Sequence, residues 1–205
     1  RVLVTGAAGF VGRHLLDALR AAGHEPLPTD LLADPAAGIE AFDICSAADA
    51  DAAVRRMRLD ACIHLAGVAF VPDAARNPQA LDAINVEGPL HVARALLHHA
   101  PHARLLFVSS AQVYGIRNRP VPAREHETPD PASPYARSKA RAEAALLELA
   151  AQQNLDVVIA RPGNHTGPGQ SPKFVVPAFI HAIRDFRDGR RALITVGKLD
   201  SERDF

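Results

Sequence analysis

The sequence contains no tryptophan, a single methionine and two cysteines among its 205 residues. Cys45 and Cys62 lack the paired spacing of a metal site, and a chain of this length needs no disulfide framework. We therefore expect both cysteines to be thiols in the core of a protein from a reducing compartment. We expect no metal ion.

Long apolar runs are also missing, because no stretch approaches the roughly 20 residues that cross a bilayer. The start shows no charged-then-apolar leader. Lys+Arg and Asp+Glu each total 23, so the formal net charge is zero and no basic block stands out. Composition thus gives no argument for a nucleic acid or a membrane as partner. We expect a soluble, cytoplasmic globular protein.

Short apolar runs alternate with longer helical patterns along the chain. The strand-like runs cover residues 1–5, 27–29, 39–44, 61–66, 105–109 and 157–160, and the first helical pattern covers 10–22. Repeated alternation of this kind favours a parallel sheet with helices on both faces. The sequence therefore predicts an α/β protein with a Rossmann-type, doubly wound parallel sheet.

Two long helices are expected at 79–99 and 135–153, which are rich in alanine and leucine. Asn77-Pro78 precedes the first and Ser133-Pro134 the second. In each pair the polar residue can cap the helix, and proline is favoured at the first helical position. These signals fix where both helices begin.

A glycine-rich segment, Thr5 to Gly12, joins the first strand to the first helix. Glycines in this place permit a tight turn and a close approach of the backbone to a pyrophosphate, which the helix N-terminus attracts. Gly6, Gly9 and Gly12 follow a G-x-x-G-x-x-G spacing rather than G-x-G-x-x-G. We expect these glycines, with Phe10 and Val11, to bind a dinucleotide cofactor. A plain strand–helix connection is the alternative.

Asp30 ends the second strand, 18 residues after Gly12. A carboxylate there can accept hydrogen bonds from the adenosine ribose and would repel a 2′-phosphate, which favours NAD(H). Arg13 on the first helix keeps NADP(H) open, and a solvated turn aspartate is the alternative for Asp30. The ends of the next strands, Asp43-Ile44 and Leu65-Ala66-Gly67, extend the expected cofactor path. His64, just before them, is expected to be a packed core histidine.

Tyr135 and Lys139 form a Tyr-x-x-x-Lys pair, whose spacing puts both side chains on one helix face. A lysine ammonium beside the phenol would lower the tyrosine pKa from about 10 and suit it to acid–base work. Lys139 can also bind the nicotinamide ribose. Ser110, at the end of a strand, is expected to hold the substrate oxygen.

These segments together resemble the extended short-chain dehydrogenases of the sugar epimerase/dehydratase family. The resemblance rests on the glycine loop, His64 to Gly67, Asn85 with Gly88, the segment Ser109 to Gly115, Ser-Pro-Tyr-x-x-x-Lys and Arg161-Pro162-x-Asn164. It implies that Ser110, Tyr135 and Lys139 form a catalytic triad. It also implies that Pro162 contacts the cofactor and Asn164 a nucleotide-sugar substrate. Gly163 departs from the phenylalanine usual in the family.

The composition changes after Pro162, where residues 163–172 concentrate glycine and proline. We expect an NAD(P)-binding domain at 1–162 and the beginning of a smaller nucleotide-sugar-binding region at 163–205. The end of the sequence carries no stop signal, so we expect the chain to continue beyond Phe205.

The residues after Ser110 and those near the end narrow the reaction. Ala111 and Gln112 stand where sugar 4,6-dehydratases carry acidic residues, which disfavours water elimination. Segments 164–175 and 196–205 resemble the GDP-6-deoxy-D-mannose reductases within the family. That resemblance implies reduction of a 4-keto GDP-sugar, with Phe174, Val175 and Arg203 as further substrate contacts. Arg203 suits a diphosphate, and a surface ion pair is its alternative.

A nucleotide-sugar 4-epimerase with tightly bound NAD is the nearest rival, because it would use the same three side chains. A non-catalytic NAD(P)-sensing protein is a rival of another class, but such proteins commonly lack the Tyr/Lys pair. The family resemblance and the alanine-rich helices also suggest a homodimer.

Overall fold

The computed structural model describes residues 1–69, 77–116, 121–197 and 199–200. They belong to two compact units, Arg1–Pro162 and Gly163–Phe205. The first unit contains a sheet, and the second contains one long helix.

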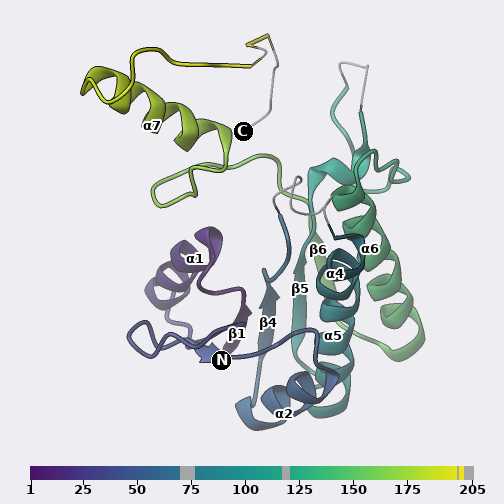
Figure 1. Cartoon of the computed structure of the whole chain (residues 1–205). Coiled ribbons are helices and arrows are strands. Elements are labelled where there is room, and N and C mark those ends of the chain that lie inside the picture. Colours follow the sequence, from purple (N-terminus) through teal and green to yellow (C-terminus); the bar gives the residue numbers. More distant parts are fainter. Residues whose placement is uncertain (70–76, 117–120, 198, 201–205) are drawn as a thin grey trace. The chain divides into compact units, whose positions relative to one another are not determined.

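A parallel sheet of six strands organises the first unit (Figure 1). The strands are β1 Val2–Thr5, β2 Pro26–Asp30, β3 Glu40–Ala41, β4 Ala61–His64, β5 Arg104–Val108 and β6 Val157–Ala160. Their order in the sheet is β3-β2-β1-β4-β5-β6, and every pairing is parallel. The first three strands are therefore added from β1 toward one edge of the sheet. The chain then returns to place β4 on the other side of β1, and β5 and β6 are added toward the opposite edge. This is the Rossmann order, with its switch point between β1 and β4.

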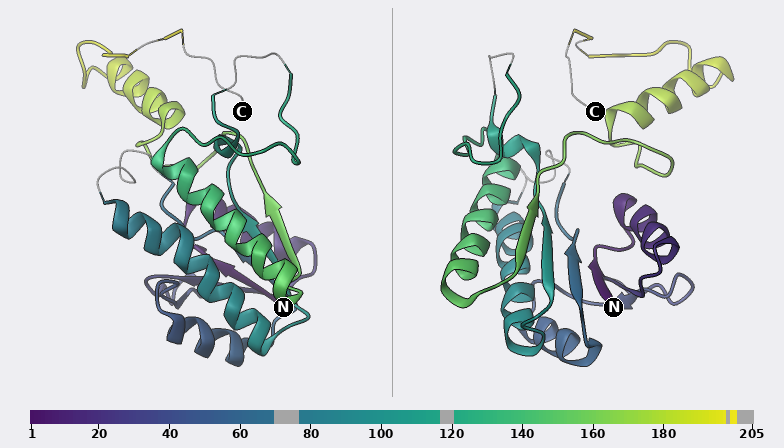
Figure 2. Two further views of the ribbon diagram at one scale, coloured as in Figure 1. Left: turned by 90° about the vertical axis from the view of Figure 1, so that its right-hand side faces the viewer. Right: turned by 180° about the vertical axis from the view of Figure 1, so that it is seen from behind.

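Helices cover both faces of the sheet, as the sequence predicted. Within Arg1–Pro162 they are α1 Phe10–Ala21, α2 Ala47–Met57, α4 Pro78–Asp82, α5 Gly88–His99 and α6 Pro134–Gln153. Figures 1 and 2 show α1 on one side of the strands and α2, α5 and α6 on the other. Right-handed crossovers require this, because the direction of strand addition reverses at the switch point.

The core follows from the alternation of side chains along the strands. Leu3 of β1 packs into the large cluster under α2, α5 and α6, whereas its neighbours Val2 and Val4 pack with Leu16 of α1. Phe107 of β5 is fully buried in the large cluster. Burial on both faces explains why the central strands read as continuous apolar runs.

The helix expected at 79–99 is real but not uniform. Residues Ala83–Glu87 form a π-helical segment between α4 and α5. Asn77 caps the start as predicted, accepting a hydrogen bond from the Ala80 N–H at 3.1 Å. Ser133 does the same for α6 through the Ala136 N–H, also at 3.1 Å.

Two α-helices were not predicted, and the strands expected at 39–44 and 61–66 are shorter than expected. Helix α2 follows Ser46, whose side chain caps it by accepting from the Asp49 N–H. Helix α7, Val175–Arg187, belongs to the second unit and begins with Pro177 in its first turn, where proline costs no hydrogen bond. The strand expected at 39–44 is reduced to Glu40–Ala41, the edge of the sheet.

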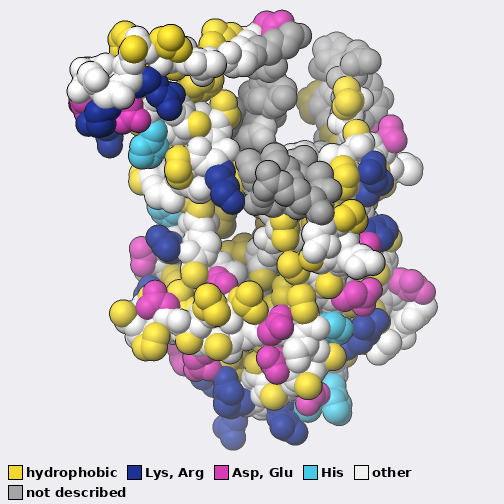
Figure 3. All heavy atoms as spheres, viewed as in Figure 1, with side chains coloured by type: hydrophobic (Ala, Val, Ile, Leu, Met, Phe, Trp, Pro, Cys, Tyr) yellow, Lys and Arg dark blue, Asp and Glu magenta, His cyan; other side chains and the backbone are white. Residues whose placement is uncertain are grey.

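None of the described helices combines the length and apolar character that a bilayer-spanning helix requires. On the face drawn in Figure 3, the described basic and acidic side chains lie interspersed. This distribution agrees with the balanced composition of the sequence.

Candidate functional site

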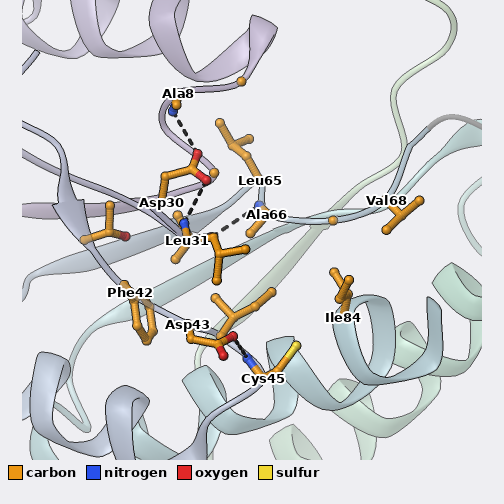
Figure 4. A pocket seen from close by; sticks show the side chains of 16 residues that line it. Ala8, Asp30, Leu31, Phe42, Asp43, Cys45, Leu65, Ala66, Val68 and Ile84 are labelled. Atoms are coloured by element: carbon orange, nitrogen blue, oxygen red, sulfur yellow. Dashed lines mark hydrogen bonds between the residues drawn. The ribbon is translucent and has the colours of Figure 1, made fainter. Parts of the chain in front are cut away.

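A pocket of about 650 Å³ opens at the carboxyl ends of the strands that flank the switch point. Its walls come from the glycine loop after β1, the end of β2, the segment after β3 and the segment after β4 (Figure 4). Loops from separate strands meet there because parallel strands end at the same edge of the sheet. The volume is in the range of sites that hold small ligands, about 300–1,000 Å³.

Glycine is required at position 6 for two independent reasons. Gly6 has a φ of +70°, which side chains rarely adopt, and a Cβ there would lie 2.7 Å from the Ala66 nitrogen. The loop after β1 therefore touches the loop after β4, and both line the pocket. Gly12 serves packing instead, since its Cβ would lie 2.5 Å from the Ala7 oxygen.

The carboxylate of Asp30 faces the glycine loop. It accepts hydrogen bonds from the Ala8 N–H at 3.0 Å and from the Leu31 N–H at 2.8 Å (Figure 4). Asp30 is thus a fixed part of the pocket wall rather than a freely solvated turn residue. Arg13 also reaches this loop, donating from Nε to the Ala8 oxygen at 3.1 Å.

Most residues expected to hold a cofactor line this pocket, namely Gly6, Gly9, Asp30, Asp43, Ile44, Leu65, Ala66 and Gly67. Phe10, Val11, Gly12, Tyr135, Lys139 and Pro162 are not among the lining residues. Sequence reasoning missed eight lining residues, Thr5, Ala8, Thr29, Leu31, Phe42, Cys45, Val68 and Ile84. All but Ile84 are direct sequence neighbours of an expected residue. Adjacency in the sequence could therefore have identified them as lining residues.

The two cysteines differ in their surroundings. Cys62 is buried, as expected, and burial raises its thiol pKa. The expectation that Cys45 is a core thiol is wrong, because its side chain is exposed and lines the pocket. Cys45 comes two residues after Asp43, whose carboxylate accepts the Cys45 backbone N–H at 2.9 Å (Figure 4).

Ser110, Tyr135 and Lys139 are brought together from two elements and are all nearly buried. Ser110 caps the short 3₁₀ helix Ala111–Tyr114 after β5. Tyr135 and Lys139 lie on the first turns of α6, and Ser110 lies close enough to the Tyr135 phenol to oppose the rise that burial causes in its pKa. The expected triad thus forms one contiguous group, whose catalytic role stays a prediction.

The expected lowering of the Tyr135 pKa does not occur in this structure. Burial raises the pKa of the phenol, and the nearby Ser110 opposes this only in part. The Lys139 ammonium donates instead to the Val108 carbonyl at 2.9 Å and lies 4.8 Å from the centre of the Phe107 ring. Spacing along a helix places two side chains on one face, but it does not specify which acceptor the ammonium takes.

Lys139 connects this group to the pocket. A Cβ at Gly67 would lie 3.4 Å from Lys139 Nζ and 3.1 Å from Asn85 Oδ1, and Gly67 lines the pocket. Burial lowers the pKa of Lys139 to about 8, although the negative charge of Glu143 opposes the shift. The ammonium therefore lies beside Gly67 in the pocket wall.

Asn85, named only as part of the family resemblance, holds this wall in place. It lies in the π-helical segment and is 1% exposed. Its Oδ1 accepts the Val68 N–H at 2.8 Å, and its Nδ2 donates to the Val68 oxygen and to Ser138 Oγ, both at 3.1 Å. π-Helical turns are frequent at functional sites, so this turn supports a functional role for the segment. The sequence alone did not indicate the turn.

His64 is a core histidine, as predicted. It is fully buried, its Nδ1 lies 3.0 Å from Thr5 Oγ1, and its ring stacks on Phe107. Burial, with the nearby Lys139 charge, lowers the pKa of His64 to about 3. The ring is therefore neutral at physiological pH.

Apart from Ser110, the expected substrate residues belong to the part of the chain after Gly163. Asn164 precedes a turn in which Thr166 donates to Gln170 at 2.8 Å, and Phe174 directly precedes α7, whose first residue is Val175. Arg203 lies outside the described residues. Each of these four assignments stays a prediction.

One group of metal-ligand side chains lies elsewhere among the described residues. Asp51 of α2 faces His98 and His99 of α5, and their ligand atoms lie within 4.8 Å of one another. His99 Nε2 is 2.6 Å from Asp51 Oδ1 and His98 Nδ1 is 3.5 Å from it. These contacts already give the Asp51 carboxylate two histidine partners from the neighbouring helix.

The sequence matches the NAD dependent epimerase/dehydratase family over residues 2–205. The chain belongs to this family. GDP-6-deoxy-D-mannose reductase of Pseudomonas aeruginosa is 37% identical over 207 residues, with 100% of this chain and 66% of that protein covered.

Two solved structures of the family share the fold. RMD from Pseudomonas aeruginosa complexed with NADPH has a TM-score of 0.80 and 34% identity, covering 94% of this chain and 62% of that chain. UDP-glucose 4-epimerase of Thermus thermophilus in complex with NAD has a TM-score of 0.77 and 31% identity, covering 84% and 58%. The chain thus spans about two thirds or less of the length of these relatives.

Proposed function

We propose that the whole protein is an NAD(P)H-dependent nucleotide-sugar reductase. Its reaction is the reduction of the 4-keto group of GDP-4-dehydro-6-deoxy-D-mannose to give GDP-D-rhamnose. The observation that carries the proposal is the buried group of Ser110, Tyr135 and Lys139, with the lysine ammonium beside Gly67 of the pocket. The similarity to a GDP-6-deoxy-D-mannose reductase over the full chain supports the choice of substrate.

The pocket fits a nicotinamide dinucleotide. The glycine loop opens on the N-terminus of α1, where free N–H groups and the helix dipole favour a pyrophosphate. Asp30 lines the pocket and would accept the adenosine ribose hydroxyls, which favours NAD(H). NADP(H) remains possible because Arg13 reaches the same loop, and the similar RMD structure holds NADPH. The bound reduced cofactor would supply the hydride that reduces C4.

The protein's own side chains would handle the oxygen and its proton. Ser110 would donate a hydrogen bond to the keto oxygen and orient it. Tyr135 would give its proton to that oxygen as the alkoxide forms, and the raised pKa of the buried phenol keeps this proton in place until then. Lys139 would bind the nicotinamide ribose and favour the tyrosinate that remains, which water then reprotonates.

Residues of the second unit would supply further contacts with the substrate. We assign contacts with the nucleotide sugar to Asn164, Phe174 and Val175, and contact with the diphosphate to Arg203. Guanidinium groups suit phosphate oxygens because they donate two parallel hydrogen bonds.

A nucleotide-sugar 4-epimerase is the second candidate. It is favoured by the similarity to a UDP-glucose 4-epimerase with NAD, and it would use the same three side chains. A 4,6-dehydratase is disfavoured, because Ala111 and Gln112 follow Ser110 and neither can act as an acid or base. A homodimer and a cytoplasmic location stay predictions, and sedimentation of the whole protein as a monomer would contradict the first.

The test is to incubate the whole protein with GDP-4-dehydro-6-deoxy-D-mannose, generated in place, and either NADH or NADPH. We expect one cofactor oxidised for each GDP-D-rhamnose formed. If neither cofactor is oxidised, the reductase proposal is wrong. A UDP-sugar interconverted without net cofactor use would then identify the epimerase.

A further inference from the structure

A buried carboxylate lies next to the proposed catalytic pair on helix α6. Tyr135, Lys139 and Glu143 follow one another at intervals of four residues, so they line one face of the helix. Glu143 is 2% exposed and Lys139 is 5% exposed. An ionised glutamate is rarely buried this deeply unless its charge is paired.

Arg161, just after β6, provides that pairing. Its Nε lies 3.0 and 3.1 Å from the two Glu143 carboxylate oxygens, and its second terminal nitrogen lies 2.5 Å from one of them. A forked contact of this kind fixes the carboxylate in both position and orientation. The pKa of Arg161 is raised further above its usual value, mainly by these bonds.

Arg161 also ties this pair to the segment that carries Ser110. Its remaining terminal nitrogen donates to Tyr114 Oη and to the Glu125 carbonyl, both at 3.0 Å, and its guanidinium lies 4.9 Å from the centre of the Tyr114 ring. Tyr114 ends the 3₁₀ helix that Ser110 begins. One guanidinium thus fixes α6 and the Ser110 segment relative to each other.

Glu143 differs from the other groups around the Lys139 ammonium because it carries a negative charge. The Val108 carbonyl and the Phe107 ring contact the ammonium but carry no charge. His64 is neutral, and Tyr135 holds its proton because burial raises its pKa. Burial lowers the pKa of Lys139, and the charge of Glu143 is the influence that opposes this.

We propose that Glu143, fixed by Arg161, is a positioning residue for the Tyr135–Lys139 pair. Its carboxylate, one helical turn beyond Lys139, provides the fixed negative charge that keeps the ammonium protonated and held at the Val108 carbonyl. Glu143 acts through Lys139 and not on the substrate. The proposal rests on the proposed function for the roles of Tyr135 and Lys139.

The test measures the titration of Lys139 directly, without turnover. In NMR of the whole protein labelled with ¹³C at the lysine ε-carbon, these 205 residues contribute three signals, from Lys139, Lys173 and Lys198. The Lys139 signal is assigned by its loss in Lys139→Arg. We expect a midpoint near 8 in the wild type and a midpoint lower by about one unit in Glu143→Gln, because an adjacent opposite charge is lost.

Glu148→Gln is the matched control, because Glu148 lies on the same helix but is exposed and bonds only Gln152 in the described contacts. Its Lys139 midpoint should equal that of the wild type. Should Glu143→Gln not fold, Glu143→Asp keeps the charge but withdraws it from Lys139, and a smaller downward shift is expected. An unchanged midpoint in the folded Glu143 variant, or an equal shift in Glu148→Gln, overturns the proposal.

The pH profile of turnover supplies a second readout. If the proposed reaction is found, the limb of kcat that follows Lys139 should move to lower pH in Glu143→Gln by the same amount as the NMR midpoint. A kcat that falls equally at every pH would mean that Glu143 only supports the fold. Absence of turnover would count against the proposed reaction, whereas the NMR titration would still decide the role of Glu143.

Discussion

Among the individual residues, Tyr135 departs most informatively from what its sequence context indicated. The Tyr-x-x-x-Lys spacing predicted that both side chains share a face, which they do. It could not predict the direction of the pKa shift, because that depends on burial by residues distant in sequence. A buried phenol that keeps its proton suits a residue that must donate one during a reduction.

Replacing Tyr135 by phenylalanine tests this role. The variant keeps the ring and loses only the hydroxyl, so we expect kcat to fall by about a hundredfold or more. NADH binding and thermal unfolding should stay near those of the wild type. Turnover retained at the wild-type level would exclude Tyr135 as the proton donor.

Gly6 gives a second test at this scale. Gly6→Ala should destabilise the protein by about 1–3 kcal/mol through backbone strain and collision, and it should weaken dinucleotide binding, because Ala66 must shift. Gly23→Ala is the matched control, since Gly23 has a similar φ of +80° but open space around it. Urea unfolding and cofactor titration measure both effects. Equal losses in the two variants would show that the contact with Ala66 is unimportant.

At the scale of elements, sequence reasoning located the central strands because they are buried on both faces and read as apolar runs. It missed α2, although Ala50, Ala53, Val54 and Met57 recur at helical spacing after the capping Ser46. It did not indicate the π-helical segment, in which Asn85 bonds to Val68 and Ser138, two residues distant in sequence. Local propensity favours an ordinary helix there.

The π-helical segment predicts a large effect for a small change. Asn85→Ala leaves the half-buried N–H and C=O of Val68 without their partner and removes the buried hydrogen bond to Ser138 Oγ, so we expect a loss of about 2 kcal/mol or more. Asn77→Ala, which removes only the helix cap of α4, should cost about 1 kcal/mol. Urea unfolding compares the two variants. A smaller loss for Asn85→Ala than for Asn77→Ala would contradict the bridging role of Asn85.

The contact between α2 and α5 predicts a pH dependence. The hydrogen bond from His99, more than any other influence, lowers the pKa of Asp51 below its ordinary value. A carboxylate with a lowered pKa stabilises the fold above its unfolded pKa of about 4, and this contribution is lost as pH falls through the lower folded pKa. Asp51→Asn should therefore be less stable than the wild type at neutral pH, and the difference should shrink in acid. A difference that grows toward low pH would contradict this sign.

At the scale of the whole molecule, the chain comprises a nucleotide-binding fold and a second unit that begins at Gly163. The parallel sheet and the site at its switch point could be predicted, because strand–helix alternation and the glycine loop are local signals. The substrate side could not, since Asn164, Phe174 and Val175 are exposed or half-buried in a unit with little core of its own. The chain spans 66% of the similar GDP-6-deoxy-D-mannose reductase.

The central claim is that the pocket between the loops after β1 and β4 holds a nicotinamide dinucleotide. Isothermal titration calorimetry of NADH and NADPH against the wild type and Gly6→Val tests it most directly. We predict one bound dinucleotide per chain, NADH bound more tightly than NADPH because of Asp30, and binding lost in a Gly6→Val variant that still unfolds cooperatively. No binding of either dinucleotide, or binding that Gly6→Val leaves unchanged, would contradict the account.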